Sequence, residues 1–94
     1  MQVRPAFHAL DAVTKLLCEL AKQPDINQYR LKTVYRLLMA IDEVVRLNAK
    51  NQEVELVSSE QSEKIKMMAE LISTNPRCKN DDTAVLAKKI SGKL

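Results

Sequence analysis

The sequence predicts an all-α fold, a compact bundle of four to five helices of which one is short. Its 94 residues are 46% hydrophobic but only 3% aromatic, so Leu, Val, Ile, Ala and Met supply the apolar side chains, a mixture that favours helices over sheets. A single glycine cannot supply the tight turns of an antiparallel sheet. Apolar residues recur at three- and four-residue steps. The length suits one core, so residues 1–94 are predicted to form a single helical domain.

The first helix is predicted over Ala6 to Lys22. Apolar residues lie at helical spacing along it: Phe7, Leu10, Val13, Leu17 and Leu20. Pro5 suits the first turn of a helix. The stretch Gln23-Pro24-Asp25-Ile26-Asn27 then predicts a loop, because proline disfavours helical geometry in the residue before it and cannot continue the hydrogen-bond ladder.

The second helix is predicted over Tyr29 to Asn48 and is the central one. Its main apolar stripe is widened by further apolar residues, which indicates contact on more than one side: Leu31, Val34, Leu38, Ile41 and Val45, then Leu37, Val44 and Leu47. A break at residues 48–51 ends it. Residues 52–58 are too short for periodicity to separate helix from strand, and a short helix fits their neighbours better.

The last two helices have clear start signals. Ser58 and Gln61 form a predicted capping box, after which Ile65, Met68, Leu71 and Ile72 give an apolar stripe as far as the breaker Ser73-Thr74-Asn75-Pro76. Asn80 or Asp81 is predicted to cap the final helix, whose acidic start and basic end match the helix dipole. Val85, Leu86 and Ile90 are its predicted buried side.

Charge weighs against nucleic-acid binding as the main role. The net charge is +3, residues 1–75 are balanced, and the basic excess follows Pro76. A dense basic face with stacking aromatics is missing from the sequence. A basic helical nucleic-acid-binding domain that uses Lys79, Lys88, Lys89 and Lys93 remains an alternative, as does a homo-oligomerising bundle built on the wide stripe of the second helix.

Catalytic and metal-binding patterns are also missing from the sequence. His8 is the only histidine, and Asp42 and Glu43 are adjacent and so project in different directions from a helix. Cys18 and Cys78 have no metal-ligand spacing, and no glycine-rich phosphate loop is present. We therefore predict no enzyme, no cofactor and no metal. With no leader-like or membrane-spanning run, a cytosolic or nuclear location with reduced thiols is expected.

Four stretches resemble the N-terminal domain family of transcription elongation factor TFIIS, which includes the integrase-binding-domain type of bundle. They are Leu37-Leu38-Met39-Ala40-Ile41-Asp42-Glu43-Val44, Val54-Glu55-Leu56-Val57, the helical run from Ile65 to Ile72, and Asn80-Asp81-Asp82-Thr83-Ala84-Val85-Leu86-Ala87-Lys88-Lys89-Ile90. Two positions depart from the family pattern. Lys66 follows Ile65 where the family usually has a small residue, and Leu94 stands where it has a conspicuous tryptophan.

The resemblance implies a non-catalytic domain that docks short linear motifs of disordered transcription elongation or chromatin regulators. It implies a nuclear location, with the cytoplasm left open. The docking edge of the integrase-binding type corresponds to Asp25, Ile26 and Asn27 and to the loop with Arg77 and Lys79. Ile26 is apolar in a polar loop, so either it is an exposed anchor contact or it folds back to cap the core. Both interpretations stay open at this point.

Overall fold

Four helices make up the part of the chain that the computed structural model describes, residues 4–50 and 56–94, and these ranges contain no strand. They are α1 (Arg4–Ala21), α2 (Gln28–Lys50), α3 (Ser59–Thr74) and α4 (Asp82–Gly92). The side chains of residues 4–8, including His8, lie outside the description. The predicted all-helical bundle is therefore confirmed at the level of fold class.

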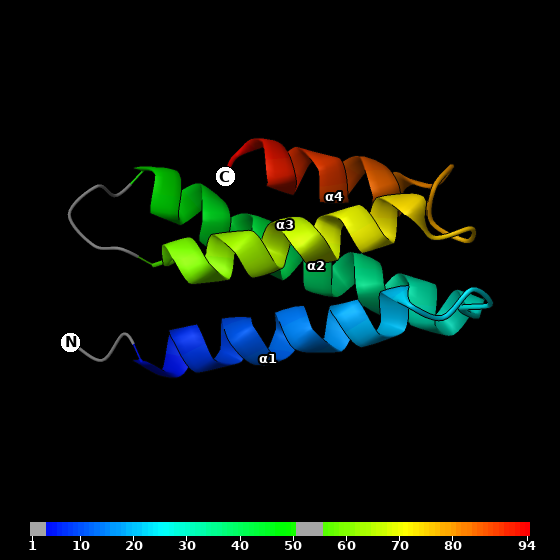
Figure 1. Cartoon of the computed structure of the whole chain (residues 1–94), viewed down its shortest axis with the longest axis horizontal. Helices are drawn as coiled ribbons and strands as arrows, with labels where there is room; N and C mark the ends of the chain where they lie inside the picture. Colours follow the sequence, from blue (N-terminus) through cyan, green and yellow to red (C-terminus); the bar gives the residue numbers. More distant parts are fainter. Residues whose placement is uncertain (1–3, 51–55) are drawn as a thin grey trace.

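Successive helices run in opposite directions along the long axis of the molecule (Figure 1). α1 packs against α2 and α3, and α4 packs against α3 and α2. α2 and α3 do not pack against each other, nor do α1 and α4, within the described residues. The order around the bundle is thus α1, α2, α4, α3, with α2 and α3 at opposite corners.

One hydrophobic core runs through the bundle and takes residues from all four helices and from the three loops that join them. It consists of Leu10, Leu17, Ala21, Ile26, Val34, Leu38, Ile41, Val45, Val57, Ile65, Met68, Ala69, Ile72, Cys78, Ala87 and Ile90. Four members of the α2 stripe are buried as predicted, namely Val34, Leu38, Ile41 and Val45. The prediction that α2 is contacted on more than one side is also confirmed, because α1 and α4 flank it.

The predicted helix boundaries hold to within two residues. α1 begins at Arg4 and ends at Ala21, and α2 extends from Gln28 to Lys50. The capping box that starts α3 is confirmed in both directions. Ser58 Oγ accepts from the backbone N–H of Gln61 at 3.1 Å, and Gln61 Oε1 accepts from the backbone N–H of Ser58 at 3.1 Å. These two bonds satisfy donors that the first turn leaves unpaired.

The predicted short helix over residues 52–58 is not seen where the chain is described. Residues 51–55 lie outside the described residues, and Leu56 and Val57 form a bend. Their backbone N–H groups both donate to Asn48 Oδ1, at 2.9 and 3.1 Å. In a helix these two N–H groups would point along the helix axis toward backbone carbonyls, but here they donate to a side chain. The side chain of Val57 is buried in the core.

Asp81, one of the two predicted caps of α4, is the one in place. Its Oδ2 accepts from the Thr83 hydroxyl at 2.6 Å and from the Thr83 backbone N–H at 3.2 Å. The hydrogen bond from the Thr83 side chain, with the backbone N–H in support, lowers the pKa of Asp81 below its ordinary value. Ionised Asp81 therefore stabilises the start of α4.

Because the pKa of Asp81 is lowered, the free energy of unfolding depends on pH with a known sign. A carboxyl whose pKa is lower in the folded than in the unfolded chain contributes stability above its unfolded pKa, about 3.9, and loses it as the pH falls through the folded value. An Asp81→Asn variant keeps a capping oxygen but does not titrate. We expect the difference in free energy of unfolding between wild type and variant to shrink on acidification. Urea unfolding followed by circular dichroism across the acidic range measures it, and a difference that is constant with pH would contradict the role of Asp81.

Candidate functional site

The two loops that the resemblance selects lie side by side at one end of the bundle (Figure 1). Residues 22–27 join α1 to α2, and residues 75–81 join α3 to α4. The side-chain amide of Asn75 donates to the backbone oxygens of Ala21 and Gln23, each at 2.8 Å. Arg77 Nε donates to the backbone oxygen of Ile26 at 3.1 Å. We call residues 22–27 and 75–81 together the loop edge.

Asn75 connects the two loops of this edge. It is only 4% exposed. Its amide nitrogen reaches the end of α1, while its Oδ1 accepts from the backbone N–H of Arg77 at 2.9 Å. All three side-chain bonds of Asn75 therefore go to backbone groups. A buried amide with such partners holds its neighbours in one geometry, because losing any of them leaves a buried polar group unsatisfied.

Of the five predicted partner-binding residues, four are exposed and one is buried. Asp25, Asn27, Arg77 and Lys79 are exposed. Ile26 is 1% exposed and belongs to the core, so the reading of Ile26 as an exposed anchor is wrong and its alternative, a side chain that caps the core, is what the structure has. Burying an isoleucine removes apolar surface from water, which outweighs its polar loop context. Asn27 also has a structural role, since its Oδ1 accepts from the Arg30 backbone N–H at 2.8 Å.

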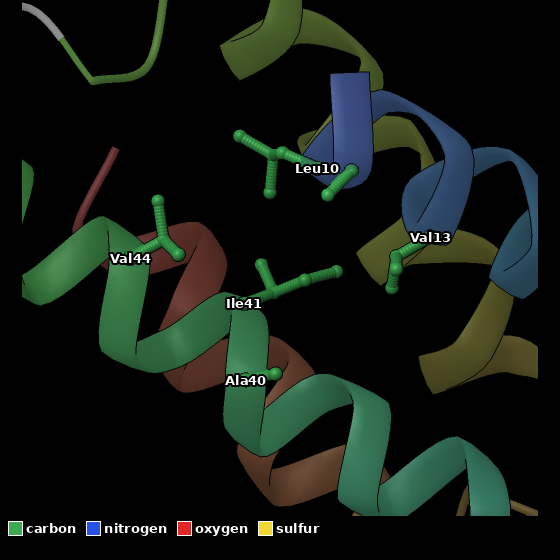
Figure 2. Close-up of a pocket in the computed structure, with 6 residues that line it drawn as sticks. Leu10, Val13, Ala40, Ile41 and Val44 are labelled. Atoms are coloured by element: carbon green, nitrogen blue, oxygen red, sulfur yellow. The ribbon is translucent and has the colours of Figure 1, made fainter. Parts of the chain in front are cut away.

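A second candidate surface lies between α1 and α2, the pair with the sparsest packing among the four contacting pairs. Its lining is apolar and encloses a cavity of about 190 Å³: Ala9, Leu10, Val13, Ala40, Ile41 and Val44. Figure 2 shows Leu10 and Val13 of α1 opposite Ile41 and Val44 of α2, with the small Ala40 beside them. We call this cavity and its rim the α1–α2 groove.

Small side chains leave the α1–α2 groove open. Ala9 and Ala40 are exposed at its sides, while Leu10 and Ile41 are buried at its floor. Helical spacing extends the apolar strip from Val13 to Leu16 on α1 and from Val44 to Leu47 on α2. Leu16 and Leu47 are 48% and 46% exposed. Sequence reasoning missed this groove, although the prediction of a widened α2 stripe was its signal.

A third surface is basic and lies on the N-terminal half of α2. A hollow there is lined by Gln28, Tyr29, Lys32, Thr33 and Arg36, and the Tyr29 side chain is 88% exposed. Between Gln28 and Ile41 the helix carries Arg30, Lys32 and Arg36 but no Asp or Glu. The net charge of residues 1–75 is zero, so it does not reveal this local excess of positive charge. We call the hollow the α2 basic pocket.

The lysines assigned to the nucleic-acid alternative are not equivalent in the structure. Lys79, Lys88 and Lys89 are exposed. Lys93 Nζ, in contrast, lies 2.7 Å from Asp42 Oδ1 in a partly buried ion pair that joins the end of α4 to α2. Glu43 pairs with Arg46 instead. Asp42 and Glu43 thus point in different directions, as their adjacency predicts.

Neither thiol is set up as a nucleophile. Cys18 is half-buried on α1 and Cys78 is buried in the α3–α4 loop, and both are free cysteines. Burial raises the pKa of each thiol above its ordinary value, so both are protonated at neutral pH. Cys18 lines a hollow between α1 and α3 with Thr14 and Met67, at the edge of which Lys64 pairs with Asp11 at 3.5 Å. Met68, predicted to be core, is fully buried.

Among the side chains that the structure describes, those of residues 9–50 and 56–94, no group of three or more His, Cys, Asp or Glu is arranged to hold a metal ion. Within residues 4–50 and 56–94, no helix has the length and apolar character needed to cross a lipid bilayer. The geometry therefore offers three surfaces on which to base a function: the loop edge, the α1–α2 groove and the α2 basic pocket. Comparisons of the chain with protein-family models, with curated proteins and with solved structures found no match.

Proposed function

We propose that the chain is a non-catalytic protein–protein interaction domain that docks short linear motifs of disordered proteins at the loop edge. The observation that supports this proposal is the pair of hydrogen-bonded connections made by Asn75 and Arg77. They join two loops that are about fifty residues apart in the sequence. A surface that is already ordered before binding loses little conformational entropy when a partner docks.

The chemistry of this edge fits a partner with acidic residues. Arg77 and Lys79 are exposed, and the Nε bond of Arg77 to the Ile26 carbonyl fixes the direction of the guanidinium group. A guanidinium held in this way can receive a carboxylate with little further loss of side-chain freedom. Because Ile26 is buried, an apolar anchor of the partner would pack against the surface around Asp25 and Asn27 and not against Ile26 itself.

The resemblance to the TFIIS N-terminal domain family supplies the partner class in this proposal. It extends the docking function to disordered segments of transcription elongation or chromatin regulators in the nucleus. The four resembling stretches, residues 37–44, 54–57, 65–72 and 80–90, support that extension, and the loop-edge geometry supports docking as such.

Reversing the charge of Lys79 tests docking at the loop edge. The probe is a synthetic peptide with one phenylalanine flanked by aspartate and glutamate. We expect Lys79→Glu to raise its dissociation constant roughly three- to tenfold, since a single charge at the rim of an interface contributes about 1 kcal/mol. Titration followed by nuclear magnetic resonance measures affinity and maps the site together.

Lys50→Glu is the matched control for that variant. Lys50 is exposed at the last residue of α2, at the end of the bundle opposite the loop edge, and its reversal changes the net charge by the same amount. We expect it to leave the dissociation constant within about twofold. Equal effects of the two variants, or peptide-induced shifts away from residues 22–27 and 75–81, would contradict docking at the loop edge.

A further inference from the structure

We infer that the α1–α2 groove and the α2 basic pocket form one continuous docking surface, and that its occupant is an acidic amphipathic helix of another protein. This surface is separate from the loop edge. The first step is its continuity. Lys32, Arg36, Ala40 and Val44 follow one another at four-residue steps, so they form one ridge that turns by about 120° around α2 between Lys32 and Val44. Lys32 and Arg36 line the basic pocket, while Ala40 and Val44 line the groove.

The apolar half of the surface has the shape that a helix needs. Leu10 and Ile41 form a floor between two antiparallel helices (Figure 2). The exposed Ala9 and Ala40 also line the groove, and their small side chains let a third backbone approach closely. The apolar side chains of a partner helix, spaced three or four residues apart, form a ridge that can pack into the groove between α1 and α2. The half-exposed Leu16 and Leu47 continue the apolar strip at its two sides.

The basic half defines the charge of the occupant. Lys32 and Arg36 lie in one hollow with the exposed Tyr29. No Asp or Glu between Gln28 and Ile41 neutralises them along the helix. The positive end of the α2 dipole lies at the same end, which adds to the attraction for carboxylates. An occupant with acidic residues over this half and apolar residues over the other is complementary along its whole length.

The spacing between the two halves predicts a sequence pattern. The midpoint of Lys32 and Arg36 is eight residues from the midpoint of Ala40 and Val44. At a rise of about 1.5 Å per residue this separation is about 12 Å. A helix that crosses α2 obliquely, following this ridge, covers that axial distance in about eight of its own residues. The expected partner thus has apolar residues at i and i+3 or i+4, and acidic residues about eight positions from them.

A second copy of this chain fits the surface less well. The exposed apolar part consists of alanines, partly buried valines and two half-exposed leucines. Its area is on the order of a few hundred Å², the size of the largest patch on an ordinary monomer. A stable dimer needs about 800 Å² from each partner. A single helix is matched to the smaller area, and it can bring the carboxylates that the basic half lacks.

The test uses a synthetic helical peptide of about 18 residues with leucines at i, i+3 and i+7 and two glutamates centred about eight positions away. We expect it to bind the full chain and to shift amide resonances of α1 and α2. Ala40→Arg places a charged side chain in the groove at an already exposed helical position. We expect it to weaken binding at least tenfold.

The matched control is Met39→Arg. Met39 is 54% exposed and adjacent to Ala40, but it is not among the residues that line the groove. The same charge on the same helix is expected to leave the dissociation constant within about twofold. Arg36→Glu tests the basic half separately. We expect this variant to bind the glutamate peptide more weakly and to bind a second peptide, in which lysines replace the glutamates, more tightly than wild type does. A variant that failed to fold would bind neither peptide.

Three results would each overturn the inference. The first is no binding of the glutamate peptide at millimolar concentration, or shifts confined to the loop edge. The second is self-association of the free chain that Ala40→Arg abolishes, which would make a second copy the occupant. The third is binding of single-stranded oligonucleotide to Lys32 and Arg36 with a steep salt dependence and no response to Ala40→Arg, which would assign the basic half to nucleic acid.

Discussion

Replacing Ile26 by alanine is expected to destabilise the folded chain by about 2–4 kcal/mol. Ile26 lies in a loop, where alanine substitutions usually change stability little. Its side chain is nevertheless in the core and only 1% exposed, so truncation removes buried methyl groups and leaves a cavity between the ends of the helices. Urea unfolding followed by circular dichroism measures the loss as a lower midpoint with an unchanged slope.

Two substitutions bracket this result. Ile26→Val removes one methylene and is expected to cost about 0.5–1.5 kcal/mol. Asp25→Ala changes the neighbouring exposed residue and is expected to stay within about 0.5 kcal/mol of wild type. If Ile26→Ala were as mild as Asp25→Ala and only peptide binding were lost, Ile26 would be an exposed anchor after all, and the core assignment would fail.

Asn75→Asp is expected to cost at least about 3 kcal/mol at neutral pH, although the two side chains have nearly the same shape. The amide of Asn75 donates to the backbone oxygens of Ala21 and Gln23. A carboxylate in the same place only accepts, so it would face two carbonyl oxygens in a site that is 4% exposed. Burial and repulsion together would favour its protonated form.

The pH dependence of the stability of Asn75→Asp shows whether the buried charge or the lost hydrogen bonds cause the destabilisation. Its new carboxyl has a higher pKa in the folded than in the unfolded chain, so the penalty is present above the unfolded pKa, about 3.9, and is relieved at lower pH. Asn75→Ala removes the same bonds without adding a charge, and its cost should not depend on pH in this way. Unfolding free energies of both variants near pH 7 and near pH 3 test the difference. A pH-independent gap between them would contradict a buried carboxylate.

Sequence patterns predict the parts of the fold that depend on local chemistry. The Ser58–Gln61 capping box and the buried stripe of α2 follow from residue type and spacing alone, because a cap or an apolar face is specified within a few turns. Loops have no such period. Whether Ile26 faces solvent or the core depends on the positions of the ends of α1 and α2 in the fold. These positions cannot be predicted from the residues next to Ile26 in the sequence.

The candidate surfaces were harder to predict for related reasons. In the sequence, Asn75 reads as part of a helix-ending cluster, and only the fold shows that its amide reaches the end of α1, about fifty residues earlier. The α1–α2 groove exists because small side chains leave space between two helices unfilled. The sequence does not show which exposed alanines will lie beside such a space. The α2 basic pocket was hidden by averaging charge over a long segment, whereas a count along one helix would have revealed it.

The Asn75 bonds also have a mechanical consequence for α1 and α2. They hold α1 at its C-terminal end, next to the loop that leads into α2, while the α1–α2 groove lies nearer the other end of the pair. Of the contacting pairs, α1 and α2 pack least closely. We therefore expect the α1–α2 groove, and not the end of α1 that Asn75 holds, to adjust its width to side chains of different size.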